Sequence, residues 1–112
     1  MAIKGNVGNF VIDILDTELM IFQVPGAADR AVIGAMSLHN TSAVTVVVQL
    51  YESTDTTIAS GKRVALLTVD ADSSADVIEC IGQGYSSTNL VAIADLVGVN
   101  AKITYTEYTA GS

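Results

Sequence analysis

The segment Val44-Thr45-Val46-Val47-Val48-Gln49-Leu50-Tyr51 decides the fold class of this 112-residue chain. If it is extended, one face carries three valines and a leucine, and the other carries Thr45, Val47, Gln49 and Tyr51. β-Branched and aromatic side chains fit a pleated strand. Because apolar residues occur on both faces, the segment predicts a central strand of a sheet or a strand at a subunit interface.

Seven further extended runs lie before and after this segment, each bounded by Gly, Asn, Asp, Ser or Pro. Their spacing of about 8–12 residues is typical of a sandwich or barrel. With the run at 44–52, the predicted strands are 10–15, 19–24, 31–38, 63–69, 76–81, 90–94 and 101–108. The sequence therefore predicts an all-β protein with about eight strands and leaves the strand order open.

The run at 89–98 admits a second interpretation. Leu90, Ile93, Ala94 and Val97 fit one face of a helix, with Asn89 as N-cap and Gly98 following the last turn. We favour the strand and keep the helix as the alternative.

Length and glycine content predict the domain organisation. The chain suffices for one domain, which we place at residues 10–112 as a β-sandwich domain. Residues 1–9 contain Gly5 and Gly8 beside polar Asn6 and Asn9, and we expect them to form a flexible N-terminal arm.

Charge and hydropathy exclude several classes of partner. The net charge is −7 and half of the residues are hydrophobic, so nucleic acid is repelled and we expect no nucleic-acid binding. The N-terminus lacks the apolar core of a signal peptide, and no stretch approaches the roughly 18 continuous apolar residues of a membrane span. We expect a soluble, unexported chain with no membrane partner.

The residues that carry chemistry are few. His39 is the single histidine and Cys80 the single cysteine, so one chain cannot build a disulfide, a cysteine-based zinc site or a multi-histidine metal site. No catalytic set is visible, and we predict that the protein is not an enzyme and has no cofactor. Tyr85, in a polar loop, is the one candidate for an exposed sugar-stacking ring.

A longer pattern resembles a known class of proteins. Val32 to Ser42 ends in an Asn40-Thr41-Ser42 corner, followed by Val44 to Tyr51 and by a final Val99 to Glu107. This layout resembles the small β-sandwich capsid decoration (cement or stapling) proteins of tailed bacteriophages, over roughly residues 31–108. The resemblance implies a single-domain antiparallel β-sandwich that is jelly-roll-like and assembles as a homo-oligomer, a dimer or trimer. It also implies synthesis in the host cytoplasm and binding to the phage major capsid protein on the exterior of the virion's capsid, where the protein clamps neighbouring coat subunits.

That expectation selects candidate contact residues. Ile3, Lys4 and Val7 would anchor the arm on the coat surface, with a disordered leader as the alternative. Val47 and Met36 are candidates for a subunit interface, with core packing as the alternative. Other open functions are a tail, spike or head-tail component and a small ligand- or carbohydrate-binding module.

Overall fold

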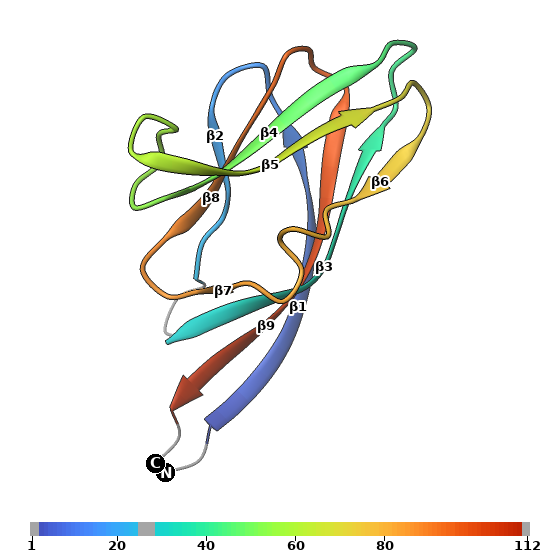
Figure 1. The fold of residues 1–112 in the computed structure, drawn as a ribbon. Coiled ribbons are helices and arrows are strands. Elements are labelled where there is room, and N and C mark those ends of the chain that lie inside the picture. Colours follow the sequence, from blue (N-terminus) through green and yellow to red (C-terminus); the bar gives the residue numbers. More distant parts are fainter. Residues whose placement is uncertain (1–2, 25–28, 111–112) are drawn as a thin grey trace.

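The computed structural model describes residues 3–24 and 29–110, and every regular element in them is a β-strand (Figure 1). The predicted antiparallel β-sandwich is confirmed. No helix among these residues is long and apolar enough to cross a membrane. The strands are β1 (Ile3–Ile14), β2 (Leu19–Phe22), β3 (Arg30–Asn40), β4 (Val46–Ser53), β5 (Gly61–Val69), β6 (Ser74–Asp76), β7 (Gly84–Tyr85), β8 (Asn89–Ala94) and β9 (Val99–Ala110).

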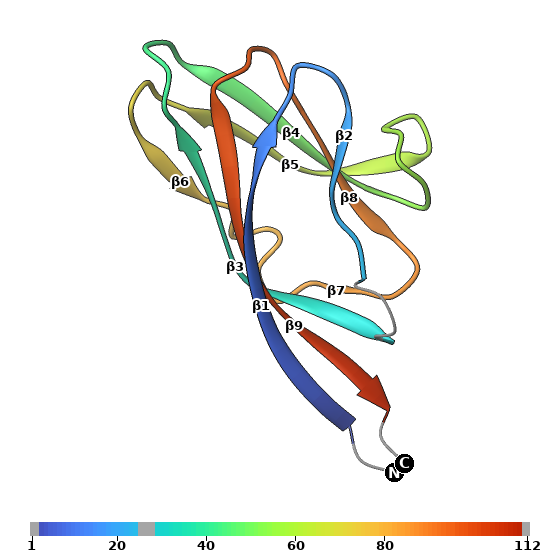
Figure 2. The same cartoon turned by 180° about the vertical axis from the view of Figure 1, so that it is seen from behind.

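Two antiparallel sheets face each other. The first has the order β1-β9-β3-β6, with β7 also paired to β3, and the second has the order β2-β8-β4-β5. The first strand thus pairs with the last and the second strand with β8, the arrangement of a hairpin rolled up into a jelly roll. β9 pairs with β3 as far as Tyr108 and with β1 as far as Ala110, so the paired ends of β1 and β9 reach slightly past β3, toward the two chain ends (Figures 1 and 2).

The core lies between the sheets and consists mainly of alternate aliphatic side chains. In β4, Val46, Val48 and Leu50 are fully buried, as the alternation in the sequence predicts. β8 is a strand rather than a helix because it lies between β2 and β4, where both of its neighbours supply backbone partners. This location also explains why Val91 and Ala92 are both buried although they point to opposite faces.

The Asn40-Thr41-Ser42 corner joins the sheets at the end of β3. The buried Asn40 amide donates hydrogen bonds to the carbonyls of Val44 at 2.7 Å and Val69 at 3.0 Å. Its own carbonyl accepts hydrogen bonds from the backbone N–H and the hydroxyl of Ser42, at 2.9 and 2.6 Å. All the hydrogen-bonding capacity of this buried side chain is used, which favours its burial.

Two predicted boundaries are wrong. Residues 3–9 of the predicted flexible arm belong to β1, because β9 is long enough to pair with them from Ile3 opposite Ala110 to Asn9 opposite Thr104. Of the predicted strand at 76–81, only Asp76 is in a strand, because β6 spans Ser74–Asp76. After Val77, the chain turns through hydrogen bonds from Cys80 N–H to Val77 and from Ile81 N–H to Ile78. Residues 1 and 2 of the predicted arm lie outside the described residues.

Candidate assembly interface

The two residues with the most reactive side chains are separated by the fold. His39 lies on the outer face of the first sheet, where its ring hydrogen-bonds the hydroxyls of Ser37 at 3.1 Å and Ser74 at 2.7 Å. Cys80 is fully buried in the core. Within the described part of the chain, no group of three or more His, Cys, Asp and Glu side chains is placed to hold a metal ion.

Burial makes Cys80 a poor nucleophile. Loss of water around the thiol raises its pKa to about 11, and the hydrogen bond from Tyr85 opposes this only in part. The thiol therefore stays protonated at neutral pH, the form that neither attacks nor binds metal. The same burial raises the pKa of Tyr85.

Tyr85 does not form an exposed platform for a sugar. Its side chain is 1% exposed and packs edge-on against Phe22, with ring centroids 5.5 Å apart. The sequence prediction of exposure was wrong because β7 pairs with β3, which turns the ring into the core. The structure thus removes the residue on which a stacking site for carbohydrate depended.

β1 is the open edge of the first sheet, and aromatic packing holds it in place. Tyr105 pairs with Gly8 across β9 and β1, and its ring lies over the glycine. The centroid of this ring lies 6.1 Å from that of Phe10 and 5.4 Å from that of Phe22, and Phe22 belongs to the opposite sheet. An aromatic ring over a glycine is a known way to stabilise an edge strand.

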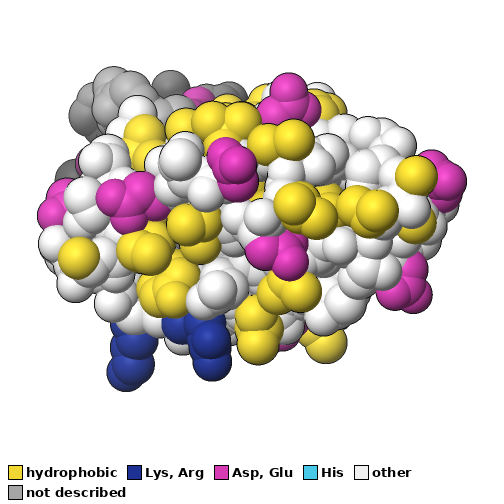
Figure 3. Space-filling view, turned by 90° about the horizontal axis from the view of Figure 1, so that it is seen from above, with side chains coloured by type: hydrophobic (Ala, Val, Ile, Leu, Met, Phe, Trp, Pro, Cys, Tyr) yellow, Lys and Arg dark blue, Asp and Glu magenta, His cyan; other side chains and the backbone are white. Residues whose placement is uncertain are grey.

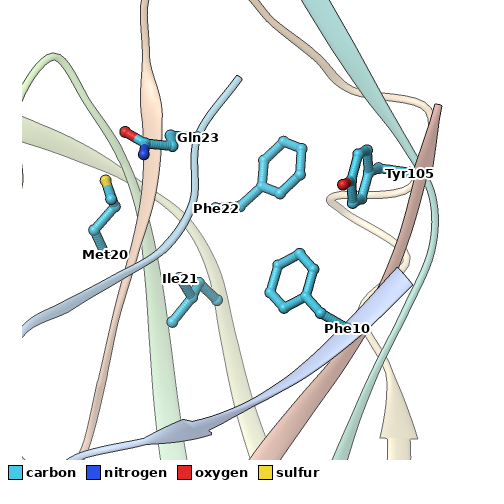
Figure 4. A pocket seen from close by; sticks show the side chains of 6 residues that line it. All are labelled: Phe10, Met20, Ile21, Phe22, Gln23 and Tyr105. Atoms are coloured by element: carbon cyan, nitrogen blue, oxygen red, sulfur yellow. The ribbon is translucent and has the colours of Figure 1, made fainter. Parts of the chain in front are cut away.

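An apolar hollow lies beside this edge, between β1 and β2. It has a volume of about 290 Å³ and is lined by Phe10, Met20, Ile21, Phe22, Gln23 and Tyr105. Figure 4 shows the rings of Phe10, Phe22 and Tyr105 gathered together, with the side chains of Met20 and Gln23 on the other side of the segment that carries Phe22. A cavity of about 150 Å³ already holds benzene, so this hollow admits one large apolar side chain.

The outer face of β1 is also apolar. Val7 is 73% exposed and Val11 is 60% exposed, and the strand has no charged residue between Gly5 and Ile12. Among residues 3–24 and 29–110, β1 stands at the end of the strand order, with no strand paired along its outer edge. A long, uncharged, partly apolar edge is the surface on which a strand of another chain can pair.

The predicted contact residues lie in three places: the edge strand β1, the hydrophobic core and strand β4. The backbones of Ile3, Lys4 and Val7 all lie in β1, and the side chains of Ile3 and Lys4 fall outside the described part. Met36 is buried in the core, in line with the alternative of core packing. Val47 is half-buried on β4, with its backbone hydrogen-bonded to Asp95.

Sequence reasoning missed the hollow and the pairing of Tyr105 with Gly8. The signal was present as alternation in the last run, which places Ile103 and Tyr105 on one face. Only the pairing of the first strand with the last reveals that this face meets Gly8 and Phe10.

Comparisons with known proteins bear on the fold. No family model and no curated protein matches the chain. A chain from the structure of Bacillus endospore appendages, which form a novel family of disulfide-linked pili, aligns with a TM-score of 0.54 and 17% identity. The alignment covers 97% of this chain and 89% of that chain, and at this identity it shows a similar fold and no more.

Two weaker likenesses are to PirA and to the VP2 subviral particle of infectious bursal disease virus. PirA aligns with a TM-score of 0.47 and 12% identity over 91% of this chain and 92% of that one. The VP2 particle aligns with a TM-score of 0.42 and 14% identity over 97% of this chain and 33% of that one. Scores this low do not establish a shared fold, so neither likeness carries an argument.

Proposed function

We propose that this protein is a structural subunit of a larger assembly, and that it binds the outer surface of an assembled phage capsid through β1. The observation that carries the proposal is the open edge of β1, with Val7 and Val11 exposed on its outer face. A strand of a coat subunit would extend the first sheet along this edge. Binding that occurs only on the assembled shell would stabilise the shell by the free energy of binding at each site, and an oligomer of this protein would bridge adjacent coat subunits.

The hollow beside β1 supplies specificity to this contact. In strand addition, backbone hydrogen bonds provide affinity, and pockets for alternate side chains select the sequence. A side chain that points inward from the added strand would meet Phe10, Phe22 and Tyr105. The partner strand would therefore carry one large apolar residue at that position.

An appendage subunit is the second candidate, and the fold shared with a chain of the Bacillus appendages supports it. Those pili are disulfide-linked. In this chain the one cysteine, Cys80, is buried with its pKa raised to about 11, so its thiol is not available for cross-linking between subunits. An assembly of this chain would be held by strand pairing and packing instead.

Co-sedimentation with assembled capsids that lack accessory proteins tests the proposal. Saturable pelleting of the wild-type protein is expected, at a stoichiometry that matches one class of symmetry site. The double variant Val7→Lys/Val11→Lys places two charges on the outer face of β1 and should weaken binding by at least about tenfold.

Ile78→Lys is the matched control. Ile78 is 72% exposed, nearly the same as Val7, but it lies in the turn after β6. Its variant should pellet like wild type. Absence of wild-type pelleting would contradict the capsid proposal, and filaments formed by the purified protein alone would favour the appendage.

A further inference from the structure

One end of the sandwich is formed by four loops, at residues 15–18, 41–45, 70–73 and 95–98, which we call the loop end. Backbone hydrogen bonds join these loops to each other or to neighbouring strands. The N–H of Ala94 donates to Leu15 at 2.9 Å, that of Thr41 to Gly98 at 3.0 Å, and that of Asp72 to Ser42 at 3.2 Å. These bonds fix the positions of the loops before any partner arrives, which lowers the entropy cost of docking.

The loop end combines exposed apolar side chains with acidic ones. Leu15 is 39% exposed, Val44 51%, Leu96 47% and Val97 58%. The acidic residues of the same loops are exposed too: Asp16, Glu18, Asp70, Asp72 and Asp95. Figure 3 views the molecule from this side and shows apolar and acidic side chains interspersed, with Lys and Arg at one margin.

A complementary surface lies on β5, one of the two edge strands of the second sheet. Lys62 and Arg63 are consecutive and exposed, Lys62 lies opposite Glu52 on β4, and Leu66 on β5 is 51% exposed. Arg63 lies opposite Tyr51 and Leu66 opposite Gln49 on β4, where the Tyr51 hydroxyl donates to the Gln49 side chain at 2.9 Å. We call these residues the β5 face: Gln49, Tyr51, Lys62, Arg63 and Leu66.

We propose that the loop end of one copy docks on the β5 face of a second copy. The argument is charge complementarity: in a chain of net charge −7, the loop end carries acids without bases, and the β5 face carries an adjacent pair of cations. Each surface also brings exposed apolar side chains, which would form the dry centre of the contact.

This contact joins two different surfaces of the chain. After two copies dock, each copy still has one unused surface, so further copies can be added. This proposal rests on the proposed function, since self-association is expected of a subunit of a larger assembly. It uses different residues from the capsid contact at β1, and the two can fail separately.

Sedimentation velocity on purified full-length protein tests this inference by charge exchange. Asp16→Lys/Asp70→Lys/Asp72→Lys leaves three lysines and two acids at the loop end and so reverses its charge, and Lys62→Glu/Arg63→Glu reverses the β5 face. Each charge variant should raise the dissociation constant for self-association by at least about tenfold, because like charges then face each other. An equimolar mixture should regain wild-type association, since every loop end again meets a β5 face of opposite charge.

Glu79→Lys/Lys102→Glu is the control, because it exchanges charges at exposed positions outside both surfaces and keeps the net charge. It should associate like wild type. A monomeric wild-type protein, variants that associate normally, or a mixture that stays dissociated would each overturn the inference. Retained capsid pelleting by both charge variants would show that the β1 contact stands independently.

Discussion

The ring of Tyr105 lies directly over Gly8, its partner across β1 and β9. A Cβ atom built on Gly8 would come within 2.5 Å of the Cζ and hydroxyl oxygen of Tyr105. The ring cannot easily move away, because Phe10 and Phe22 pack against it from the two sheets. This contact fixes the edge strand and shapes the hollow beside it, so it links the fold to the proposed assembly surface.

Gly8→Ala should therefore destabilise the protein by about 1–2 kcal/mol through overpacking. Urea unfolding measures this loss. In a Tyr105→Leu background the same substitution should cost less, since the shorter side chain leaves room for the methyl group. Equal costs in both backgrounds would show that the ring is not what excludes a side chain at position 8.

Asn40→Ala should cost about 1–3 kcal/mol, because the buried carbonyl of Val69 loses its amide donor and the carbonyl of Val44 loses one of two donors. Chemical unfolding at neutral pH gives the value. Asn40→Asp keeps the acceptor for Ser42 but cannot donate, so it should be at least as destabilising. Wild-type stability of Asn40→Asp would contradict the role assigned to the two donated hydrogen bonds.

Gly98 and Gly82 form a matched pair for backbone strain. Both have positive φ, 125° and 82°, but a Cβ at Gly98 would lie 2.8 Å from the Cβ of Ser42, whereas nothing lies within 4 Å at Gly82. Gly82→Ala should cost about 1 kcal/mol from left-handed backbone alone. Gly98→Ala should cost about 2–3 kcal/mol, from strain plus the clash. Thermal unfolding of both variants gives the comparison, and equal costs would remove the clash from the account.

The raised pKa of the buried Cys80 thiol predicts that the folded protein loses stability at alkaline pH. Burial raises its pKa from 9.0 to about 11, so the folded thiol holds its proton between these values while the unfolded thiol releases it. The contribution of the protonated Cys80 thiol to the free energy of unfolding is fully present below pH 9.0 and declines as pH rises toward 11. Urea midpoints over this range should fall more steeply in the wild-type protein than in Cys80→Ala. The variant keeps part of the decline, because Tyr85 also has a raised pKa. Parallel pH profiles of the two proteins would contradict the burial of the thiol.

Alternation within single segments was enough to predict the fold class and most strands. The run at 44–52 shows why: Val46, Val48 and Leu50 are fully buried and Val47, Gln49 and Tyr51 are half-buried, as the two-sided pattern indicated. The pattern fails only at its start, where Val44 precedes β4 and is 51% exposed. The corner at Asn40 was also visible, because a polar turn between two apolar runs needs residues that bind their own backbone.

The errors came from contacts that are distant in sequence. Gly5, Gly8 and two asparagines make residues 1–9 look unstructured, yet β9 supplies a backbone partner to each residue from Ile3 onward. Tyr85 was placed on the surface because its neighbours Ser86 and Ser87 are polar, whereas pairing of β7 with β3 buries the ring. Local composition carries no information on such pairings, and the assembly edge depends on them.

Hydrogen–deuterium exchange on the protein bound to assembled capsids tests the central claim most directly. If a coat strand adds to β1, amides in residues 3–14 should exchange at least about tenfold more slowly in the complex, because their outward N–H groups gain partners. Amides of β2, the edge of the opposite sheet, should be unchanged. Binding without added protection in β1 would contradict the account, and protection confined to another edge would identify that edge as the contact.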